Sequence, residues 1–594
     1  RSRLSRTVLR AAAIVGALAG FVAGVDLLRA LRPALLVDPE PAWAVPRLLL
    51  GLAVAAAAAG AGALAAGLYA FWAREPASRA PLRPLAGSRL AFALLAAGAV
   101  CAGAALRFAA LSRIPEPLWI DDASLIPAAL ELSGRPSDFA DAIRPAPFGV
   151  AKPYGSVGVL YLEGFRASLR GFGATVFGVR FPAALAGSLS IATGALLGAS
   201  LLPAGGGALT ALALAGMRGH LILSRWSWCM IVLVPIVDLA TLALVHARRR
   251  RSAGLALLGG AIAGIGAHVY LAAWPAAAGL GLFALWPAAP ARRATELPDE
   301  RPERRRERLG RAALFALGFA LAASPIFLLR SGRTAPYFAR TSDHNVRLEI
   351  ARSGSLLPPF AAAADTLAAP WLIPDPIARH DLPGRSRLGW LLGIPAAIAL
   401  ARSLIRPRDG LSALVLAQTV AVLAATVAGG QADHPNGARF AYLTTLAALC
   451  AAAGLIWLAG LAPGRLRSAA AIAAAGVLVV AGALGARDAL RIWPDRPETF
   501  DGFHGQDTLI GRAAARWDRY GDVGIASGLG HSPLTIGAVR RWRLDPDAAG
   551  APSARRGFRV RIAAPGDAGG EGERRVETIA DPRGTEWAVV WAAK

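Results

Sequence analysis

Two adjacent carboxylates, Asp121 and Asp122, follow an apolar run and precede a stretch that is typical of an amphipathic helix. The run, Leu90–Leu111, is long enough to cross a bilayer, and Trp119 is suited to the lipid–water boundary. Carboxylates this close to hydrocarbon are costly unless they are solvated or paired, which motivates a functional hypothesis. A structural alternative is that one of them caps a helix beginning at Ala123. Capping would satisfy one acid and leave the other unexplained.

Four later segments place basic side chains at the ends of apolar runs. They are Val179-Arg-Phe-Pro-Ala-Ala-Leu-Ala-Gly187, the turn Ser224-Arg225-Trp226-Ser-Trp228, Ile373-Pro-Asp-Pro-Ile-Ala-Arg379-His380-Asp-Leu-Pro-Gly384, and His434-Pro-Asn-Gly-Ala-Arg439. Each arginine also has a structural explanation, because arginine at a helix end extends its charge to the interface. A loop histidine is usually solvated, and for Lys152 in an earlier loop an interface anchor is the simpler account.

The composition is that of a protein embedded in a membrane. Apolar residues make up 55% of the 594 residues, and runs long enough to span a bilayer recur almost to the end. A net charge of +25 would indicate nucleic acid in a soluble chain. Here, however, the arginines concentrate in short loops between apolar runs, which is the positive-inside pattern. We therefore expect membrane lipid, and no nucleic acid, as a partner.

Hydropathy predicts a polytopic α-helical membrane protein with roughly thirteen transmembrane helices. The predicted spans are Leu9–Leu28, Leu48–Trp72, Leu90–Leu111, Phe181–Leu202, Ala208–Leu223, Met230–Val245, Gly254–Tyr270, Ala272–Trp286, Ala313–Leu329, Leu388–Leu404, Leu411–Ala428, Phe440–Leu461 and Ala469–Leu484. With the N-terminus inside, the arginine-rich loops are cytoplasmic. The outer loops, 112–180, 223–228, 330–387 and 429–439, and the tail after Arg487 then form an extracytoplasmic functional face.

The first outer loop and the tail are predicted to have structure of their own. Residues Pro153–Arg166 are apolar but short, so we predict a helix lying in the interface. Residues 491–594 (the tail) contain strand-like and helix-like runs typical of a small soluble α/β domain; the strands are expected at Val523–Ala526, Arg559–Ala563 and Trp587–Trp591, the helices near 507–519 and 534–542, and a Gly-rich loop at 565–573. The predicted organisation is two additional N-terminal helices in 1–87, a membrane core in 88–490, and the tail domain.

Together these segments resemble the membrane-embedded C-type glycosyltransferases. The closest resemblance is to glycosyltransferase family 39, which includes protein O-mannosyltransferases and bacterial lipid A aminoarabinose transferases. That family carries an acidic pair in its first outer loop soon after a helix, which Asp121 and Asp122 match. The family's Arg-Leu-Pro-like segment, Ser-Arg turn, Arg-His-Asn-Leu-Pro-Gly-like segment and Pro-x-x-x-Arg segment correspond to the four basic segments above. The resemblance extends from Leu90 to Leu484.

The resemblance implies the C-type fold and an inverting transfer of one sugar from a polyprenyl-phosphate donor. The acceptor would be a hydroxyl of an extracytoplasmic lipid, glycan or protein, at the inner membrane of a bacterial cell envelope. Asp121 would accept the proton of that hydroxyl as general base. Cations would stabilise the charge that develops on the leaving polyprenyl phosphate. The candidates are Arg180, Arg225 and Arg439, which offer a fork to phosphate, and Arg379, His380, His434 and Lys152.

One departure from related oligosaccharyltransferases concerns a metal ion. Those enzymes place acids just after the Ser-Arg turn, where they help to hold a divalent cation, whereas here Trp226-Ser-Trp228-Cys-Met follows. The pair Asp121 and Asp122 forms a poor cage by itself. We predict no tightly held cofactor. The sequence leaves open whether Asp121 and Asp122 hold a divalent cation weakly.

Two other functions also stay open. An O-antigen ligase or polymerase likewise combines many spans with a large outer loop that carries arginine and histidine. It does not predict acids directly after an early span. A membrane transporter or scaffold would make Asp238, inside an apolar run, the important residue. The simpler expectation is that Asp238 hydrogen-bonds to neighbouring helices, and no internal repeat in the sequence favours a transporter.

Overall fold

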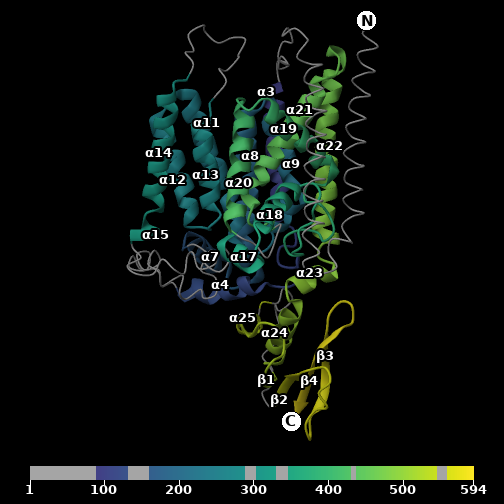
Figure 1. Ribbon diagram of the computed structural model, residues 1–594. Helices are drawn as coiled ribbons and strands as arrows, with labels where there is room; N and C mark the ends of the chain where they lie inside the picture. The colour runs from purple at the N-terminus through teal and green to yellow at the C-terminus, as the bar shows by residue number, and fades with distance from the viewer. Residues whose placement is uncertain are drawn as a thin grey trace.

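The computed structural model describes residues 88–131, 159–287, 303–328, 346–429, 436–518, 520–542, 544 and 558–593. The first two predicted spans lie outside these ranges, and so do Lys152 and His434. The described residues form an upright bundle of helices, a layer of short helices across its lower end, and a sheet below that layer (Figure 1).

Apolar helices make up the bundle. Their bounds are α3 (Ser88–Phe108), α8 (Val176–Leu201), α9 (Gly206–Ala215), α10 (Arg218–Leu223), η2 (Cys229–Val232), α11 (Leu233–Arg250), α12 (Ala253–Ala267), α13 (Ala273–Leu285), α14 (Arg305–Ala323), α19 (Gly389–Ile405), α20 (Gly410–Gly429), η3 (Ala441–Leu443), α21 (Thr444–Gly460), η4 (Gly464–Leu466), α22 (Arg467–Arg487) and η5 (Asp488–Ile492). Within the described ranges, six helical stretches are long and apolar enough to cross a membrane. The chain is a multi-pass membrane protein.

Every predicted span after the first two overlaps a helix, although not every span is one continuous helix. The span predicted at Ala208–Leu223 is α9 followed by α10, with Gly216 and Met217 between them. At this point α22 passes very close, since a Cβ on Gly216 would overlap the main chain of Gly482. Such an approach of two backbones requires glycine. The break leaves Arg218 as the first residue of α10, at the lower end of the bundle.

Small residues also allow close packing elsewhere in the bundle. On α12, Gly260 and Gly264 face α14, and a side chain at either position would overlap main-chain atoms around Phe315 or Phe319. Gly318 of α14 meets the main chain of α12 in the same way. The two helices therefore pack backbone to backbone, as membrane helices with spaced glycines do.

Two short helices, α4 (Ile120–Glu131) and α7 (Val159–Phe172), lie across the lower end of the bundle (Figure 1). Their buried faces share one core, which includes Leu125 and Ile126 of α4 and Phe165 of α7. The helix predicted over Pro153–Arg166 overlaps α7. The remaining helices before α19 are α15 (Pro325–Leu328), α17 (Val346–Ser353) and α18 (Leu357–Ala368).

The tail contains a four-stranded sheet in the order β1-β2-β4-β3. Its elements are α23 (Pro497–Gly502), α24 (Gly505–Trp517), β1 (Gly521–Ile525), α25 (Pro533–Trp542), β2 (Phe558–Ala563), β3 (Arg574–Ala580) and β4 (Glu586–Ala593). β1 and β2 are parallel, with Val523 opposite Val560, and the other pairs are antiparallel. The three predicted strands are present as β1, β2 and β4. β3 was not predicted, because its sequence is polar and mostly exposed, as suits an edge strand.

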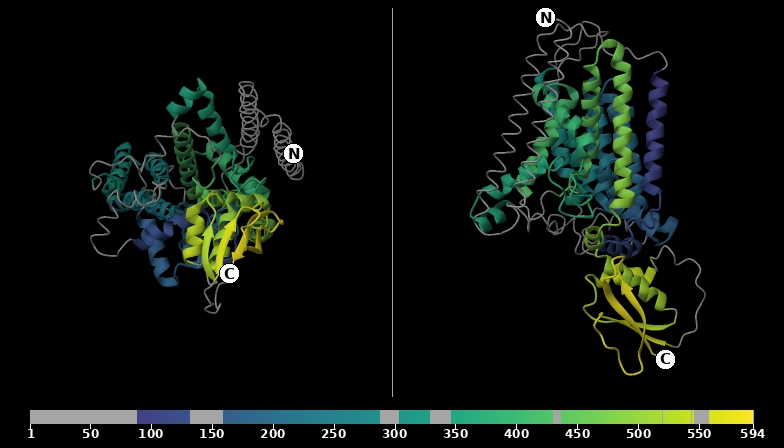
Figure 2. Two further views of the ribbon diagram at one scale, coloured as in Figure 1. Left: turned by 90° about the horizontal axis from the view of Figure 1, so that it is seen from below. Right: turned by 90° about the vertical axis from the view of Figure 1, so that its right-hand side faces the viewer.

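The basic loops meet at the end of the bundle opposite the tail. Arg251 lies 3.8 Å from Glu307, and the Trp286 side chain donates to the carbonyl of Pro407 at 2.7 Å. These contacts join the connections that follow α11, α13 and α19. The tail lies beyond the other end (Figure 2, right). The described parts of the arginine-rich loops therefore lie at one end of the bundle, as the charge pattern requires if they share one side of the membrane.

This arrangement leads to a labelling prediction. We expect a cysteine at the exposed position Ser527 (Ser527→Cys), just after β1, to react with a membrane-impermeant maleimide in intact cells. A cysteine at exposed Gly464 (Gly464→Cys), at the arginine-rich end, should react only after lysis. The unaltered chain, with its own Cys101, Cys229 and Cys450, serves as the blank. The reverse pattern would place the tail in the cytoplasm.

Candidate functional site

The two acids lie in the first turn of α4. This helix begins at Ile120, three residues earlier than predicted, so Asp121 and Asp122 are inside it instead of in front of it. Asp122 is fully buried, and its Oδ2 accepts the main-chain N–H of Trp119 at 3.2 Å. This is the back-bond of a capping box, in which an acid in the first turn satisfies the amide that precedes the helix. Asp122 therefore caps the helix from within its first turn, whereas the sequence predicted an acid that precedes the helix.

Two of the predicted phosphate ligands are instead buried against the main chain that leads to α4. Arg225 donates to the carbonyls of Leu106, Arg107, Ala109 and Ile114 at 2.6–3.2 Å. The side chains of Arg225 and of the second arginine, Arg180, have no measurable exposure.

Arg180 donates to the carbonyls of Leu111 and Pro117 at 3.0 and 2.8 Å. Its charge is attracted by the nearby carboxylate of Asp122. In the structure both arginines donate to main-chain carbonyls, because the end of α3 and the irregular main chain after it leave several carbonyls that no helix satisfies. They hold the acid segment (residues 113–131) in place.

The segment that carries Arg379 and His380 connects the acid segment to the bundle. The Arg379 guanidinium lies 4.0 Å from the centre of the Trp119 ring, and its Nη1 donates to the carbonyl of Gly502 at 3.3 Å. His380 is buried beside Trp226, with ring centres 6.0 Å apart. Its Nδ1 lies 3.5 Å from Oδ1 of Asp375, which is at the limit of a hydrogen bond. Arg379 therefore contacts the acid segment, and the adjacent His380 contacts the bundle.

Burial lowers the pKa of His380 below its ordinary value, although Asp375 opposes this effect. For Asp375, burial raises the pKa, but contact with His380, the charge of Arg387 and the N–H of Ile377 together bring it below its ordinary value. We infer a neutral imidazole beside an ionised carboxylate.

Asp375 and Arg387 hold a tight turn at Gly437. Oδ2 of Asp375 accepts from Nη2 of Arg387 at 3.0 Å and from the N–H of Gly437 at 2.8 Å. Nη1 of Arg387 donates to the carbonyl of Gly437 at 2.6 Å. A side chain at Gly437 would overlap this guanidinium. Arg387 was not among the predicted site residues, although it stands only three positions after the Arg-His-Asp-Leu-Pro-Gly segment.

A buried ion-pair network ties the same loop to two other elements. Arg218 of α10 donates to Asp381 at 2.7 Å and lies 3.5 Å from Asp488 of η5. Arg385 contacts the same carboxyl of Asp488 at 2.7 Å. Asp488 is buried, whereas Arg385 is half exposed. The network fixes residues 381–387 against the lower end of the bundle.

An apolar cavity of about 170 Å³ opens beside Arg387. It lies between α18, α19, α20 and α21, and its lining is apolar except for a few threonines and Arg387. Representative lining residues are Leu367, Leu388, Leu400, Val422, Phe440 and Ala447. A long hydrocarbon chain with a charged end matches this distribution of surfaces, since the hydrocarbon is buried and the charge meets a guanidinium.

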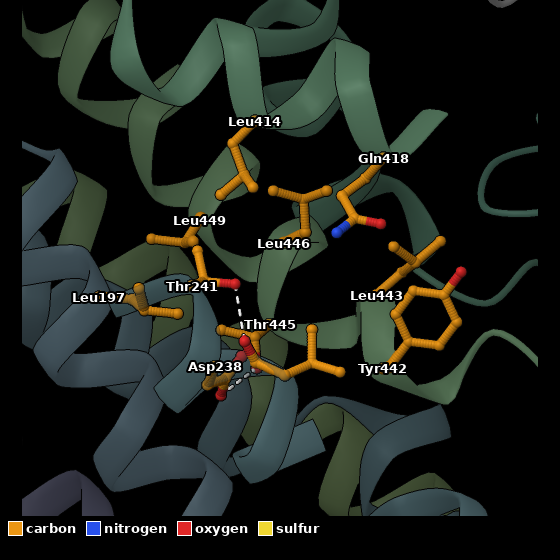
Figure 3. A pocket seen from close by; sticks show the side chains of 11 residues that line it. Leu197, Asp238, Thr241, Leu414, Gln418, Tyr442, Leu443, Thr445, Leu446 and Leu449 are labelled. Carbon is orange, nitrogen blue, oxygen red and sulfur yellow. Dashed lines mark hydrogen bonds between the residues drawn. The ribbon is translucent and has the colours of Figure 1, made fainter. Parts of the chain in front are cut away.

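A second cavity, of about 20 Å³, lies deeper in the bundle around Asp238 (Figure 3). Oδ2 of Asp238 accepts from Thr193 of α8 at 2.6 Å and from Thr445 of α21 at 2.9 Å. The prediction that Asp238 hydrogen-bonds to neighbouring helices is confirmed. Gln418 and Tyr442 also line this space, which is large enough for about one water molecule.

The other predicted residues can be placed only in part. Arg439 is partly buried just before η3, and its N–H faces Oδ1 of Asn436 at 3.4 Å. Lys152 and His434 fall outside the described ranges, and for Asp121 only the main chain is described. Across the residues that the structure describes, no three His, Cys, Asp or Glu side chains are grouped so that they could hold a metal ion.

No protein-family model matches the chain, and a search of curated proteins finds no match. Among solved structures, the chain is similar to ArnT from Cupriavidus metallidurans bound to undecaprenyl phosphate, with 13% identity and a TM-score of 0.45 over 84% of this chain and 97% of that one. It is also similar to the oligosaccharyltransferase AglB from Archaeoglobus fulgidus in complex with an inhibitory peptide and a dolichol-phosphate. Here the identity is 12% and the TM-score 0.43, over 76% of this chain and 63% of AglB.

Proposed function

We propose that the chain is a membrane-embedded glycosyltransferase. It moves one sugar from a polyprenyl-phosphate donor to a hydroxyl of an extracytoplasmic lipid, glycan or protein, with inversion at the anomeric carbon. The observation that carries this proposal is the apolar cavity beside Arg387, which is joined through Asp375, His380 and Arg379 to the segment bearing Asp121. A lipid-linked charged donor and a carboxylate base are the two things this reaction needs.

In this proposal, the part of the polyprenyl chain nearest the phosphate occupies the cavity between α18 and α21, and the phosphate meets Arg387. A guanidinium has five N–H groups, and the contacts of Arg387 with Asp375, Asp381 and Gly437 leave some of them for phosphate oxygens. The side chain is only 14% exposed, so its charge is weakly screened. The arginine stabilises the negative charge that the phosphate gains as it leaves.

The acceptor hydroxyl attacks the anomeric carbon from the side opposite the phosphate. Its proton passes to the carboxylate of Asp121, the new C–O bond forms, and the bond between the anomeric carbon and the phosphate oxygen breaks. The electron pair of that bond leaves with the polyprenyl phosphate. The tight turn at Gly437 and the ion pair of Arg218 with Asp381 hold the loop that carries Arg387 against the bundle.

The donor site is tested by comparing two arginines of the same loop. Arg387→Gln should weaken binding of undecaprenyl phosphate to the purified protein by about 10–100-fold, because a charged hydrogen bond is lost. Arg385→Gln removes a neighbouring, half-exposed arginine that does not line the cavity; Arg218 and Arg487 still pair with Asp488 in this variant, so binding should be unchanged. Arg387→Lys should rescue only part of the loss, since a point charge cannot reproduce the fork.

Binding is measured by native mass spectrometry in detergent, and the melting temperature of each variant shows that it is folded. Equal affinities in the Arg387 and Arg385 variants would remove Arg387 from the donor site. Transfer itself is measured with undecaprenyl-phosphate-linked mannose and related sugars, using envelope extract of cells lacking the protein as acceptor. No transfer from any of these donors by the unaltered chain would contradict the proposed function.

A further inference from the structure

The tail contacts the acid segment directly, on the side away from the bundle. In Figure 1, α24 and α25 lie beneath α4, with the sheet farther below. Val539 of α25 and Leu544 belong to the same buried core as Leu118 and Leu125 of the acid segment. The acid segment is therefore enclosed between the bundle and the tail.

One contact is a buried hydrogen bond at the start of α4. The main-chain N–H of Leu118 donates to Oγ1 of Thr508, on α24, at 3.0 Å. Leu118 and Thr508 are 0% and 1% exposed, so water does not compete for this bond. The next amide along the chain, that of Trp119, is satisfied by Asp122. The point at which α4 begins is thus determined by one hydrogen bond from within the helix and one from the tail.

A second contact is made by Arg512, one turn after Thr508 on the same face of α24. Its Nη1 lies 2.9 Å from Oε1 of Glu116, and its Nη2 donates to the Glu116 carbonyl at 3.2 Å. The Arg512 side chain is only 8% exposed, although that of Glu116 is 49% exposed. The bond to the carbonyl does not depend on the glutamate side chain, so Arg512 fixes the main chain as well as a charge.

Aromatic contacts extend the same interface. The ring of His504, which precedes α24, meets Trp119 edge to face with centres 5.0 Å apart. Arg379 covers the same tryptophan. Burial, and then the charges of His531 and Arg379, lower the pKa of His504, so that a neutral ring lies beside the arginine. Tail, loop and acid segment meet at this tryptophan, two residues before Asp121.

We propose that Thr508 and Arg512 are positioning residues for Asp121, so that the tail is part of the machinery for transfer. This inference rests on the proposed function. The bundle holds the carbonyls of the acid segment through Arg180 and Arg225, and the tail holds its amide at Leu118 and its main chain at Glu116. Because a displacement of about 1 Å in a reacting group can lower a rate by about 100-fold, small losses of register at α4 have large effects on turnover.

The experiment uses two matched pairs of substitutions in the full chain. Thr508→Val removes the hydroxyl at constant shape, and Thr508→Ser keeps it. Arg512→Gln removes the contact with Glu116. Arg516→Gln makes the same change one turn further along α24, where the arginine contacts Glu577 within the tail. The Thr508→Ser and Arg516→Gln variants control for general effects on the tail.

Two readouts are taken for each variant. In hydrogen–deuterium exchange, peptides covering residues 114–131 should exchange faster in Thr508→Val and Arg512→Gln than in either control. In the transfer assay, kcat should fall by about tenfold or more, with KM for undecaprenyl-phosphate mannose nearly unchanged. A structural effect spread over the whole protein would instead raise exchange everywhere and change both kinetic constants.

The outcomes separate this inference from the proposed function. If the unaltered chain transfers sugar and all four variants match it, Thr508 and Arg512 do not position the acid, and the inference is overturned. If exchange in residues 114–131 is the same in all variants, the contact itself is overturned. If exchange responds as expected but no donor yields transfer, the proposed function fails while the positioning contact stands.

Discussion

Replacing Asp121 with asparagine is expected to lower the rate of sugar transfer by about 10²–10⁴-fold, the usual cost of losing a general base. The amide has nearly the size of the carboxylate but cannot accept the proton of the attacking hydroxyl. Binding of undecaprenyl phosphate should be unaffected, because the proposed phosphate ligand, Arg387, lies on another segment. The measurement is turnover of undecaprenyl-phosphate mannose by the purified variant, together with its melting temperature and its affinity for undecaprenyl phosphate.

The neighbouring acid is the matched control. Asp122 is fully buried and accepts the N–H of Trp119. Its replacement by asparagine keeps an oxygen that can accept this bond but removes the charge that attracts Arg180. We therefore expect a loss of stability of only about 1 kcal/mol, with turnover in proportion to the amount of folded protein. Near-normal turnover by the Asp121 variant would refute the assignment of the base. A rate loss confined to the Asp122 variant would move the base by one residue.

Replacing Arg225 with alanine is expected to destabilise the whole protein, and this is the second large effect. The side chain satisfies four carbonyls, two in the last turn of α3 (Leu106 and Arg107) and two in the connection from α3 to α4 (Ala109 and Ile114). Leaving buried carbonyls without donors costs on the order of 1–3 kcal/mol for each unsatisfied group. We expect a lower melting temperature and poor recovery from detergent. Lysine should not restore stability, because its single ammonium cannot span four acceptors.

Arg491 serves as the control for this substitution. It is exposed at the same end of the bundle, and Arg491→Ala should melt at the same temperature as the unaltered protein. Melting is followed in detergent by the fluorescence of the tryptophans. An Arg225→Ala protein with an unchanged melting temperature and a lost affinity for undecaprenyl phosphate would show that Arg225 binds the donor directly.

Much of the architecture could be predicted because it depends on local properties of the chain. A membrane span is recognised from the length of an apolar run, and each predicted span after the first two overlaps a helix. Three strands of the tail have alternating or continuous apolar residues and were placed correctly. β3 has neither pattern, because it is an exposed edge strand. The break at Gly216 was also missed, and the glycine of α22 that packs against it comes from a distant part of the chain.

In the candidate site, too, some features could be predicted from the sequence and others depend on the tertiary structure. Residue types and order were enough to select the acid segment, its capping acid and the loop that contains Arg379 and His380. The partner of each arginine was not predictable, because a guanidinium binds whichever acceptors the fold brings near. For Arg225 these are carbonyls more than 100 residues earlier in the chain. For Arg387 they are Asp375 and a turn 50 residues later.

By itself the sequence determined that this is a multi-pass membrane protein with an acidic pair soon after an early span and basic segments that follow in order. Hydropathy and helix capping act over a few neighbouring residues, so they can be read from the chain. Only the tertiary structure decided that Arg180 and Arg225 serve the main chain, that Arg387 lines the apolar cavity, and that Thr508 of the tail meets Leu118. These outcomes depend on unsatisfied carbonyl and amide groups, which arise only where packed elements leave them, and no local pattern in the sequence marks them.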